Sequence, residues 1–137
     1  IRIEYSMVMS ETQEIRKRTP KVVAIDDDVI LLKTLRRFYA DRPMSFFAAE
    51  TGRTGLELIA KEHPDAVLLD NILPDLEGVN LIEQIRQFDP HLPVLLITAQ
   101  GTSHVAIDAM KRCAFDYLPK PFDLDDLSKR IRAMVTN

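Results

Sequence analysis

The sequence predicts an α/β domain in which a parallel sheet carries helices on both faces. Three short apolar runs, over 22–25, 66–69 and 94–97, contain β-branched residues and do not alternate with polar ones, a pattern typical of parallel strands buried on both faces. Stretches whose apolar residues recur with helical spacing separate these runs. Since strands and helices alternate, we expect five successive strand–helix units in a doubly wound arrangement with right-handed crossovers.

Weaker patterns supply the remaining elements. Strand signals over 45–48 and 114–118 complete the five expected strands. The second helix is expected to begin near Thr54 and to end at His63 and Pro64, and Asp28 and Asp123 are expected to cap the first and last helices. The apolar residues expected to share a helix face are Leu31, Leu32, Leu35, Phe38 and Tyr39; Leu81, Ile82 and Ile85; Val105, Ala106, Ala109 and Met110; and Leu124, Leu127, Ile131 and Val135.

The composition is that of a soluble globular protein with a hydrophobic core. Of 137 residues, 46% are hydrophobic and 28% are charged, and a single domain of this length buries about two-thirds of its unfolded surface. The 21 acidic residues outnumber the 18 basic ones, and the net charge of −3 disfavours nucleic-acid binding through the protein's own field. The single cysteine, Cys113, excludes an internal disulfide and a cysteine-cluster metal site.

No segment has the features of a membrane span or a signal peptide. The apolar runs are far shorter than the roughly 18 residues that a membrane-spanning helix needs, and residues 1–18 mix charges throughout. We therefore expect a reduced, cytoplasmic protein without membrane contact. Residues 1–20 lack strand-like runs and end in a proline, so we expect a solvated leader there, with a short helix over 11–18 as the alternative.

Polar side chains follow four of the expected strands at the point where each strand ends. Asp26, Asp27 and Asp28 follow the first strand, Asp70 the third, Thr98 the fourth and Lys120 the fifth. The carboxyl ends of parallel strands lie at one edge of the sheet, where open α/β sheets bind their ligands. We therefore expect these acidic, hydroxyl and ammonium groups to meet in one site.

The chemistry of such a site points to phosphoryl transfer. Crowded carboxylates raise one another's pKa, and a hard divalent cation or a lysine ammonium relieves the repulsion. Mg²⁺ suits the site because it binds one or two carboxylates, keeps several waters and leaves room for a phosphoryl group. Lys120 and Thr98 can bind phosphoryl oxygens. An aspartate held between Mg²⁺ and Lys120 can then attack phosphorus and form an aspartyl phosphate.

Four motifs make residues 21 to about 135 resemble the receiver domain of two-component response regulators. They are VVAIDDD (22–28), VLLDNILPDLEG (67–78), VLLITAQG (94–101) and DYLPKPF (116–122), and they occur in the family's order and spacing. The segments AIDAMKR and FDYLPKPFDLDDL look closest to receivers of enhancer-binding transcription activators. The resemblance implies a flavodoxin-like (βα)5 fold with strand order 2-1-3-4-5, a receiver domain over 21–137 and a separate segment over 1–20.

The resemblance also implies a magnesium site. Asp70 would be the phosphoacceptor and would bind Mg²⁺ through one carboxylate oxygen. Asp27 would bind the ion directly, Asp26 mostly through water, and Ile72 through its backbone carbonyl.

Further roles carried by the resemblance concern the phosphoryl group and the conformational switch. Thr98 and Lys120 would contact the phosphoryl group, and Thr98 would couple its presence to loop position. Tyr117 matches the aromatic residue that changes rotamer on activation, although by itself it would be read as a half-buried strand residue. The Lys120–Pro121 peptide bond would be cis.

The expected partner is a sensor histidine kinase or a phosphotransfer protein. His63, His91 and His104 lie far apart beside turns or helix ends, so we expect surface residues, and a phosphodonor histidine on another protein. The chain would catalyse its own phosphorylation and dephosphorylation without turning over a metabolite. We expect the signal to emerge on the face of the last two strand–helix units as a shift of populations.

That face also carries charges with two interpretations. Lys111, Asp116, Arg130 and Arg132 can pair across a homodimer or be solvated surface charges, and we favour the second for each residue alone. No helix-turn-helix or ATPase motif is present, and the chain stops soon after the last expected helix. We therefore expect the output domain to lie outside this chain.

Several residues near the motifs have structural explanations. We favour Asp28 as a helix N-cap over a metal ligand, and Asp75 and Glu77 as solvated turn residues over metal contacts. Pro74 and Gly78 are expected to shape the loop after the phosphoacceptor.

Three residues depart from the family pattern. Cys113 stands where the family commonly has glycine at a helix end; a left-handed conformation would cost about 1 kcal/mol there, so either the backbone differs or the helix runs on. Ile72 and Gln100 would flank the path of a hydrolytic water. We expect Ile72 to hinder that water and to slow self-dephosphorylation.

Two other functions fit part of the pattern. Asp26 and Asp28 form a D-x-D pair as in haloacid-dehalogenase-like phosphatases, but Ile30 stands where those enzymes have a hydroxyl and Asp70 would have no task. A pseudo-receiver that binds partners without phosphorylation is the second alternative, but every residue needed for the chemistry is present. We favour the phosphoacceptor receiver over both.

Overall fold

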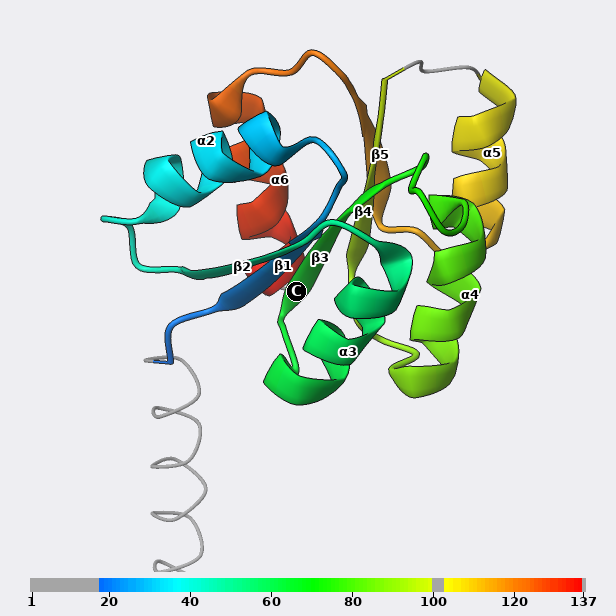
Figure 1. Ribbon diagram of the computed structural model, residues 1–137, viewed down its shortest axis with the longest axis horizontal. Helices are drawn as coiled ribbons and strands as arrows, with labels where there is room; N and C mark the ends of the chain where they lie inside the picture. Colours follow the sequence, from blue (N-terminus) through cyan, green and yellow to red (C-terminus); the bar gives the residue numbers. More distant parts are fainter. Residues whose placement is uncertain (1–17, 100–102, 137) are drawn as a thin grey trace, which may run out of the picture.

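The computed structural model describes residues 18–99 and 103–136, so the predictions for residues 1–17 and for Gln100 lie outside the described residues. Strands and helices alternate along the described chain (Figure 1). The elements are β1 (Lys21–Ile25), α2 (Val29–Tyr39), β2 (Ser45–Ala49), α3 (Gly52–Glu62), β3 (Ala66–Asp70), α4 (Gly78–Phe88), β4 (Val94–Thr98), α5 (Ser103–Lys111), β5 (Asp116–Pro119) and α6 (Leu124–Thr136).

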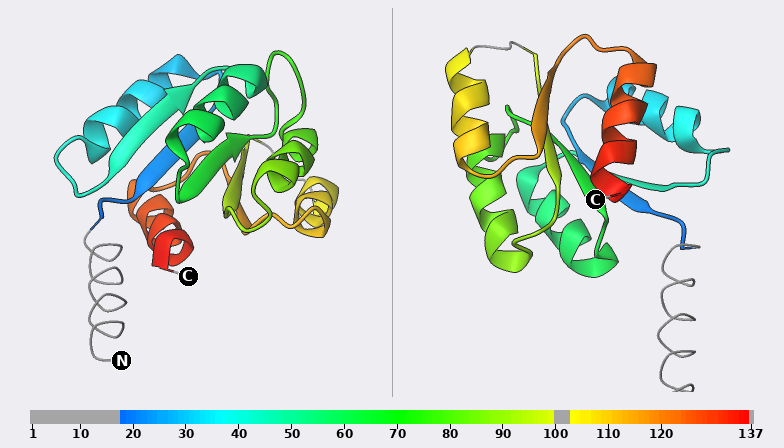
Figure 2. Two further views of the ribbon diagram at one scale, coloured as in Figure 1. Left: turned by 90° about the horizontal axis from the view of Figure 1, so that it is seen from below. Right: turned by 180° about the vertical axis from the view of Figure 1, so that it is seen from behind.

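The five strands form one parallel sheet in the order β2-β1-β3-β4-β5, which confirms the predicted topology. Helices α3, α4 and α5 pack on one face, and α2 and α6 on the other (Figures 1 and 2). Successive residues of a strand point to opposite faces, so Val23 and Ile25 join one core cluster and Val22 and Ala24 the other. This is why the strand sequences are continuously apolar.

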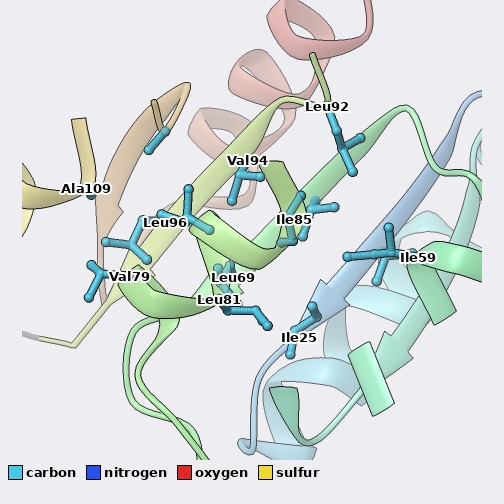
Figure 3. Close-up of a cluster of buried hydrophobic side chains, with 14 of the residues drawn as sticks. Ile25, Ile59, Leu69, Val79, Leu81, Ile85, Leu92, Val94, Leu96 and Ala109 are labelled. Atoms are coloured by element: carbon cyan, nitrogen blue, oxygen red, sulfur yellow. The ribbon is translucent and has the colours of Figure 1, made fainter. Parts of the chain in front are cut away.

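The larger core cluster lies between the sheet and helices α3, α4 and α5 (Figure 3). Leu81, Ile82 and Ile85 of α4 are all fully buried there, as the helical spacing predicted. On the other face, α6 buries Leu127 and Ile131 as predicted, together with Met134; the predicted Val135 is only partly buried.

The beginnings of two helices test the predicted caps. Asp28 caps α2, because its carboxylate accepts the Leu31 N–H at 3.1 Å, and this confirms the prediction. Helix α3 begins earlier than predicted. Thr51 is its N-cap, and Thr54 is the third helical residue of a capping box, so the expected start near Thr54 was wrong by two residues.

The end of α5 also differs from the sequence-based predictions. Cys113 has a left-handed backbone conformation, with φ of 67°. Both expectations, a different backbone there and a helix that runs on, were therefore wrong. Its N–H donates to the Met110 carbonyl at 3.1 Å, and the Ala114 N–H donates to the Ala109 carbonyl at 3.0 Å, a Schellman motif. Since Ala114 belongs to this motif, β5 begins at Asp116 and not at residue 114.

Among the described residues, the longest helix, α6, has 13 residues, and no helix combines the length and apolar character that a membrane crossing requires.

Replacing Ile82 by alanine is expected to destabilise the fold by about 2–5 kcal/mol, because it leaves a cavity under α4 where no solvent reaches. Ile107→Ala is the matched control: that side chain is 55% exposed, and its loss should cost less than about 0.5 kcal/mol. Urea unfolding followed by circular dichroism measures both changes. Equal losses for the two variants would contradict the packing described above.

Candidate functional site

The predicted site residues come together where β1, β3, β4 and β5 end, at the upper edge of the sheet in Figure 1. Asp26 follows β1, Asp70 and Thr98 are the last residues of β3 and β4, and Lys120 follows β5. The strands are in parallel register, with Asp70 beside Ile97. The Lys120 N–H donates to the Thr98 carbonyl at 2.7 Å, which ties these two backbones together. The sheet therefore sets the spacing of the site.

Three carboxylates form the centre of the site. One oxygen of each of Asp26, Asp27 and Asp70 lies within 4.8 Å of the others, and this is the one such acidic group that the described residues contain. Asp26 and Asp70 are buried, with 3% and 6% of their surfaces exposed, whereas Asp27 is exposed. Hard oxygen ligands at this spacing, open to solvent on one side, fit Mg²⁺.

The Lys120 ammonium group opposes these charges. Lys120 Nζ donates to Asp26 Oδ2 at 2.6 Å and lies 3.9 Å from Asp70 Oδ2. The other oxygen of Asp26, Oδ1, accepts the Asp28 N–H at 2.9 Å. Asp26 is thus held by two protein donors, and Asp70 has the weaker contact with the lysine. The Lys120–Pro121 peptide bond is cis, as the resemblance implied.

The imbalance of charge appears in the pKa of Asp70, which is raised from 3.8 to about 6. Burial is the largest cause, and the negative charge of Asp26 is the second. The Lys120 ammonium and the Ile72 N–H act in the opposite direction but do not compensate. A cation that binds beside Asp70 would therefore be stabilised by the same charge that raises this pKa.

The backbone after Asp70 is closely packed. The Gly78 N–H donates to the Asn71 carbonyl at 2.7 Å, and a Cβ atom at Gly78 would lie 2.3 Å from the Asp70 carbonyl oxygen. The φ of Gly78 is not positive, so a left-handed conformation does not explain the glycine. Glycine is required here because the two backbone segments approach closely. This agrees with the expectation that Gly78 shapes the loop.

The remaining predicted residues lie on β4, on β5 and in the loop after β3. Thr98 is buried at the end of β4. The Ile72 side chain is 68% exposed, and Ile72 pairs with Glu77 in an isolated bridge. Glu77 is at the N-cap position of α4 but makes no capping hydrogen bond with its side chain. Tyr117 on β5 is 37% exposed and lines a hollow together with residues of α5.

Asp75 has a role that the sequence pattern did not predict. Its carboxylate accepts the N–H groups of Gly52 and Arg53, both at 2.9 Å, at the beginning of α3. Asp75 is an exposed turn residue, as predicted, but its carboxylate also binds the start of α3. No local pattern could have indicated this contact, because its partners lie more than twenty residues earlier and α3 already has a capping box of its own.

Asp116 and Arg130, two of the charged residues discussed for the dimer surface, form ion pairs within the chain. Arg130 pairs with Asp116 and, at 3.6 Å, with Asp126 of the same chain, so Asp116 and Arg130 are not purely solvated surface charges. Lys111 and Arg132 are exposed.

The histidines lie outside the acidic group. His91 and His104 are exposed, as predicted. His63 is exposed as well, as predicted, and its ring stacks on Phe88 with 6.0 Å between centroids. Within the described residues, none of the three belongs to a group that could hold a metal ion.

Known proteins resemble this chain in sequence. The family model of the response regulator receiver domain matches residues 22–132. The chain is 37% identical over 115 residues to response regulator MprA from Mycolicibacterium vanbaalenii, covering 84% of this chain and 50% of MprA. It is 35% identical over 108 residues to regulatory protein AtoC from Escherichia coli, covering 79% of this chain and 23% of AtoC. It thus spans half or less of the length of these relatives.

Solved structures give the same result. The receiver domain of the Francisella response regulator 1452 superimposes with a TM-score of 0.79 at 27% identity, covering 85% of this chain and 97% of that domain. The likeness therefore extends over nearly the whole of the Francisella domain.

Replacing Asp70 by asparagine is expected to stabilise the metal-free protein at pH 7.5. The folded-state pKa of about 6 exceeds the unfolded value of 3.8. The folded protein therefore gains stability as the pH falls from about 7 to about 4, and it loses this stability when the pH rises and Asp70 ionises. The gain from this substitution should be about 1–2 kcal/mol, since one pKa unit corresponds to about 1.4 kcal/mol and solvent screens part of the interaction.

Urea unfolding in EDTA at about pH 7.5 and at about pH 4.5 measures this difference. The gain should shrink at the lower pH. Asp28→Asn is the control: it keeps a capping side chain at the start of α2 and should show no comparable pH-dependent gain. A gain from Asp70→Asn that does not change with pH would contradict the assigned pKa.

Proposed function

The chain belongs to the response regulator receiver domain family, and we propose that it is a phosphorylation-controlled switch whose phosphoacceptor is Asp70. The observation that carries this proposal is the meeting of Asp26, Asp27 and Asp70 within 4.8 Å, with Lys120 beside them. We take residues 21–137 as the receiver domain and residues 1–20 as a separate leader; the family match over 22–132 supports the first boundary.

The proposed donor is a phosphohistidine on a sensor histidine kinase or a phosphotransfer protein. An oxygen of the Asp70 carboxylate forms a bond to phosphorus while the bond between phosphorus and the donor's imidazole nitrogen breaks, and the electron pair stays on that nitrogen. Asp70 must be ionised for this attack. Lys120, 3.9 Å from Asp70 Oδ2, is close enough to balance charge on the transferring group.

Receiver domains generally bind Mg²⁺ in an acidic pocket, and the acidic group has the ligands for it. We assign Asp27 and Asp70 as direct ligands, together with the backbone carbonyl of Ile72. Asp26 would act through water, because both of its oxygens already accept protein hydrogen bonds. When bound, Mg²⁺ would supply positive charge that lowers the repulsion between the carboxylates and an incoming phosphoryl group.

Thr98 and Lys120 would bind the phosphoryl oxygens and transmit their position. The hydrogen bond from the Lys120 N–H to the Thr98 carbonyl links the two residues, and Tyr117 lies three residues before Lys120 on β5. A change at the site can therefore reach the exposed surface over α5. There Ile107, Met110 and Tyr117 line a shallow hollow of about 520 Å³.

We assign this surface to the output. It would bind an output domain or a partner, or form a homodimer through the last two strand–helix units. Its exposed apolar side chains support this role, since Ile107 is 55% and Met110 47% exposed. Asp116 and Arg130 already pair with each other within one chain, so self-association would depend on the apolar residues and on the exposed Lys111 and Arg132.

The proposed activity is confined to the chain's own phosphorylation and dephosphorylation. No metabolite would be turned over, the protein would act in the cytoplasm, and nucleic acid would be bound by an output domain. The phosphatase alternative gains no support: the Asp28 carboxylate faces the start of α2, and the acidic group contains Asp26, Asp27 and Asp70 instead. A pseudo-receiver would not require this acidic group beside a lysine.

Acetyl phosphate with Mg²⁺ is expected to add one phosphoryl group to the wild-type protein and none to Asp70→Ala, because the nucleophile is then missing. Intact-mass spectrometry measures the product. Asp28→Asn, which changes an adjacent acid outside the acidic group, should be phosphorylated like the wild type. Phosphorylation of Asp70→Ala, or of the wild type in EDTA, would contradict the proposal.

Replacing Ile72 by asparagine is expected to speed loss of the phosphoryl group by about tenfold, because a polar side chain at this exposed position can orient the attacking water. The decay is followed by intact mass after removal of acetyl phosphate and histidine donors. Ile107→Asn, at a similarly exposed position on α5, is the control and should decay at the wild-type rate. Unchanged or slower decay of Ile72→Asn would show that Ile72 does not hinder hydrolysis.

A further inference from the structure

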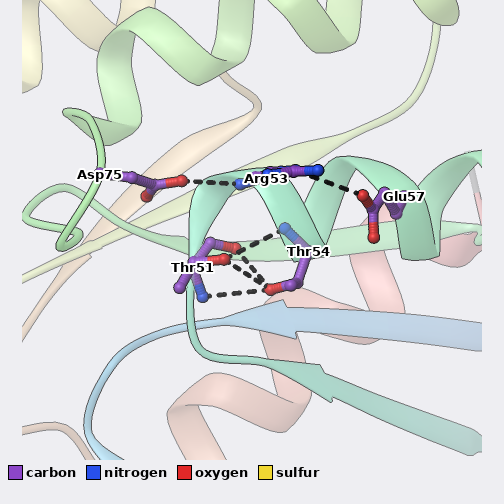
Figure 4. A network of polar contacts seen from close by, with 5 residues as sticks. All are labelled: Thr51, Arg53, Thr54, Glu57 and Asp75. Atoms are coloured by element: carbon purple, nitrogen blue, oxygen red, sulfur yellow. Dashed lines mark hydrogen bonds and ion pairs between the residues drawn. The ribbon is translucent and has the colours of Figure 1, made fainter.

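The loop that follows the proposed phosphoacceptor is attached to a neighbouring helix by one side chain (Figure 4). Asp75 lies in the β3–α4 loop, and its carboxylate accepts two backbone N–H groups at the start of α3. Oδ1 accepts the Gly52 N–H and Oδ2 accepts the Arg53 N–H, both at 2.9 Å. These bonds lower the pKa of Asp75, so it is ionised at neutral pH.

The N-terminus of α3 has room for this contact because its own cap leaves two donors unused. Thr51 Oγ1 accepts the Thr54 N–H at 3.1 Å, and the Thr51 carbonyl accepts the Gly55 N–H at 3.0 Å. The N–H groups of Gly52 and Arg53 remain, and Asp75 takes both. Since Gly52 is buried, its N–H would otherwise lack a partner.

The packing around this contact fits the loop closely. A Cβ atom on Gly52 would lie 2.9 Å from Leu76 Cδ2, so the absence of a side chain at Gly52 lets the loop approach α3. Within the loop, the Leu73 N–H donates to the Leu76 carbonyl at 3.3 Å, and Ile72 bridges to Glu77. Asp75 therefore sits at the tip of a closed turn whose first residue is Ile72.

We propose that Asp75 is a positioning residue for the magnesium site: by holding the β3–α4 loop against α3, it presets the backbone of Ile72. This inference rests on the proposed function, which makes the Ile72 carbonyl a magnesium ligand. A residue that orients a ligand without touching the metal commonly changes metal affinity by about tenfold or more when it is removed. The Asp75 carboxylate makes charge-assisted hydrogen bonds, which are stronger than those between neutral groups.

The test measures the dissociation constant for Mg²⁺ alone, from NMR chemical shifts of backbone amides during titration with MgCl₂. Asp75→Ala should raise the dissociation constant by about five- to tenfold. Asp75→Asn should have an intermediate effect, because its amide oxygen can accept a hydrogen bond but its NH₂ group cannot accept the second one. Both variants should be phosphorylated by acetyl phosphate more slowly than the wild type at low Mg²⁺. Their phosphorylation rates should recover toward the wild-type rate at saturating Mg²⁺.

Thr51→Ala is the matched control. It removes the local capping bond of α3 and should lower the thermal unfolding midpoint, yet it leaves the loop contact intact. Its Mg²⁺ dissociation constant should stay within about twofold of the wild-type value. If Asp75→Ala fails to fold, Asp75→Asn carries the comparison.

Two results would overturn the inference. One is Mg²⁺ binding by the Asp75 variants within about twofold of the wild type; the other is equal weakening by Thr51→Ala, which would assign the effect to the stability of α3. A wild-type protein that neither binds Mg²⁺ nor accepts a phosphoryl group would instead contradict the proposed function itself.

Discussion

The repulsion between the carboxylates of Asp26 and Asp70 is the constraint on which the site depends. Both are buried at the ends of adjacent strands, and one ammonium group, Lys120, lies between them and closer to Asp26. Burial and the neighbouring charge raise the pKa of Asp70 to about 6. A divalent cation bound there would relieve the repulsion and, with Lys120, would supply positive charge toward an anionic phosphoryl group. In the proposed function, metal binding and phosphorylation would thus depend on the same excess of negative charge.

The sheet makes this unfavourable arrangement tolerable. Its central strands are buried on both faces by two separate apolar clusters, and close packing holds their carboxyl ends at fixed spacing. The free energy gained by burying these strands offsets the cost of holding two acids out of water. The loop after Asp70 is equally confined, since Gly78 approaches the Asp70 carbonyl too closely for any side chain.

The site is connected to two different parts of the molecule. On one side, Lys120 and Thr98 are joined by a backbone hydrogen bond, and β5 leads from Lys120 back to Tyr117 and the apolar surface over α5. On the other side, Asp75 joins the loop after Asp70 to the start of α3. The first connection suits transmission of a signal. The second suits positioning, because it ties a loop to a helix whose beginning is already capped.

The sequence alone determined the order of elements, the parallel sheet and the strand ends at which Asp26, Asp70, Thr98 and Lys120 lie, because periodicity and strand-terminal polar residues are local features. It also indicated the cap at Asp28. Only the tertiary structure decided that Asp75 binds the start of α3, that Arg130 pairs with Asp116 and that burial is the largest cause of the raised pKa of Asp70. These properties arise between segments far apart in the chain, and packing geometry decides which of their groups meet.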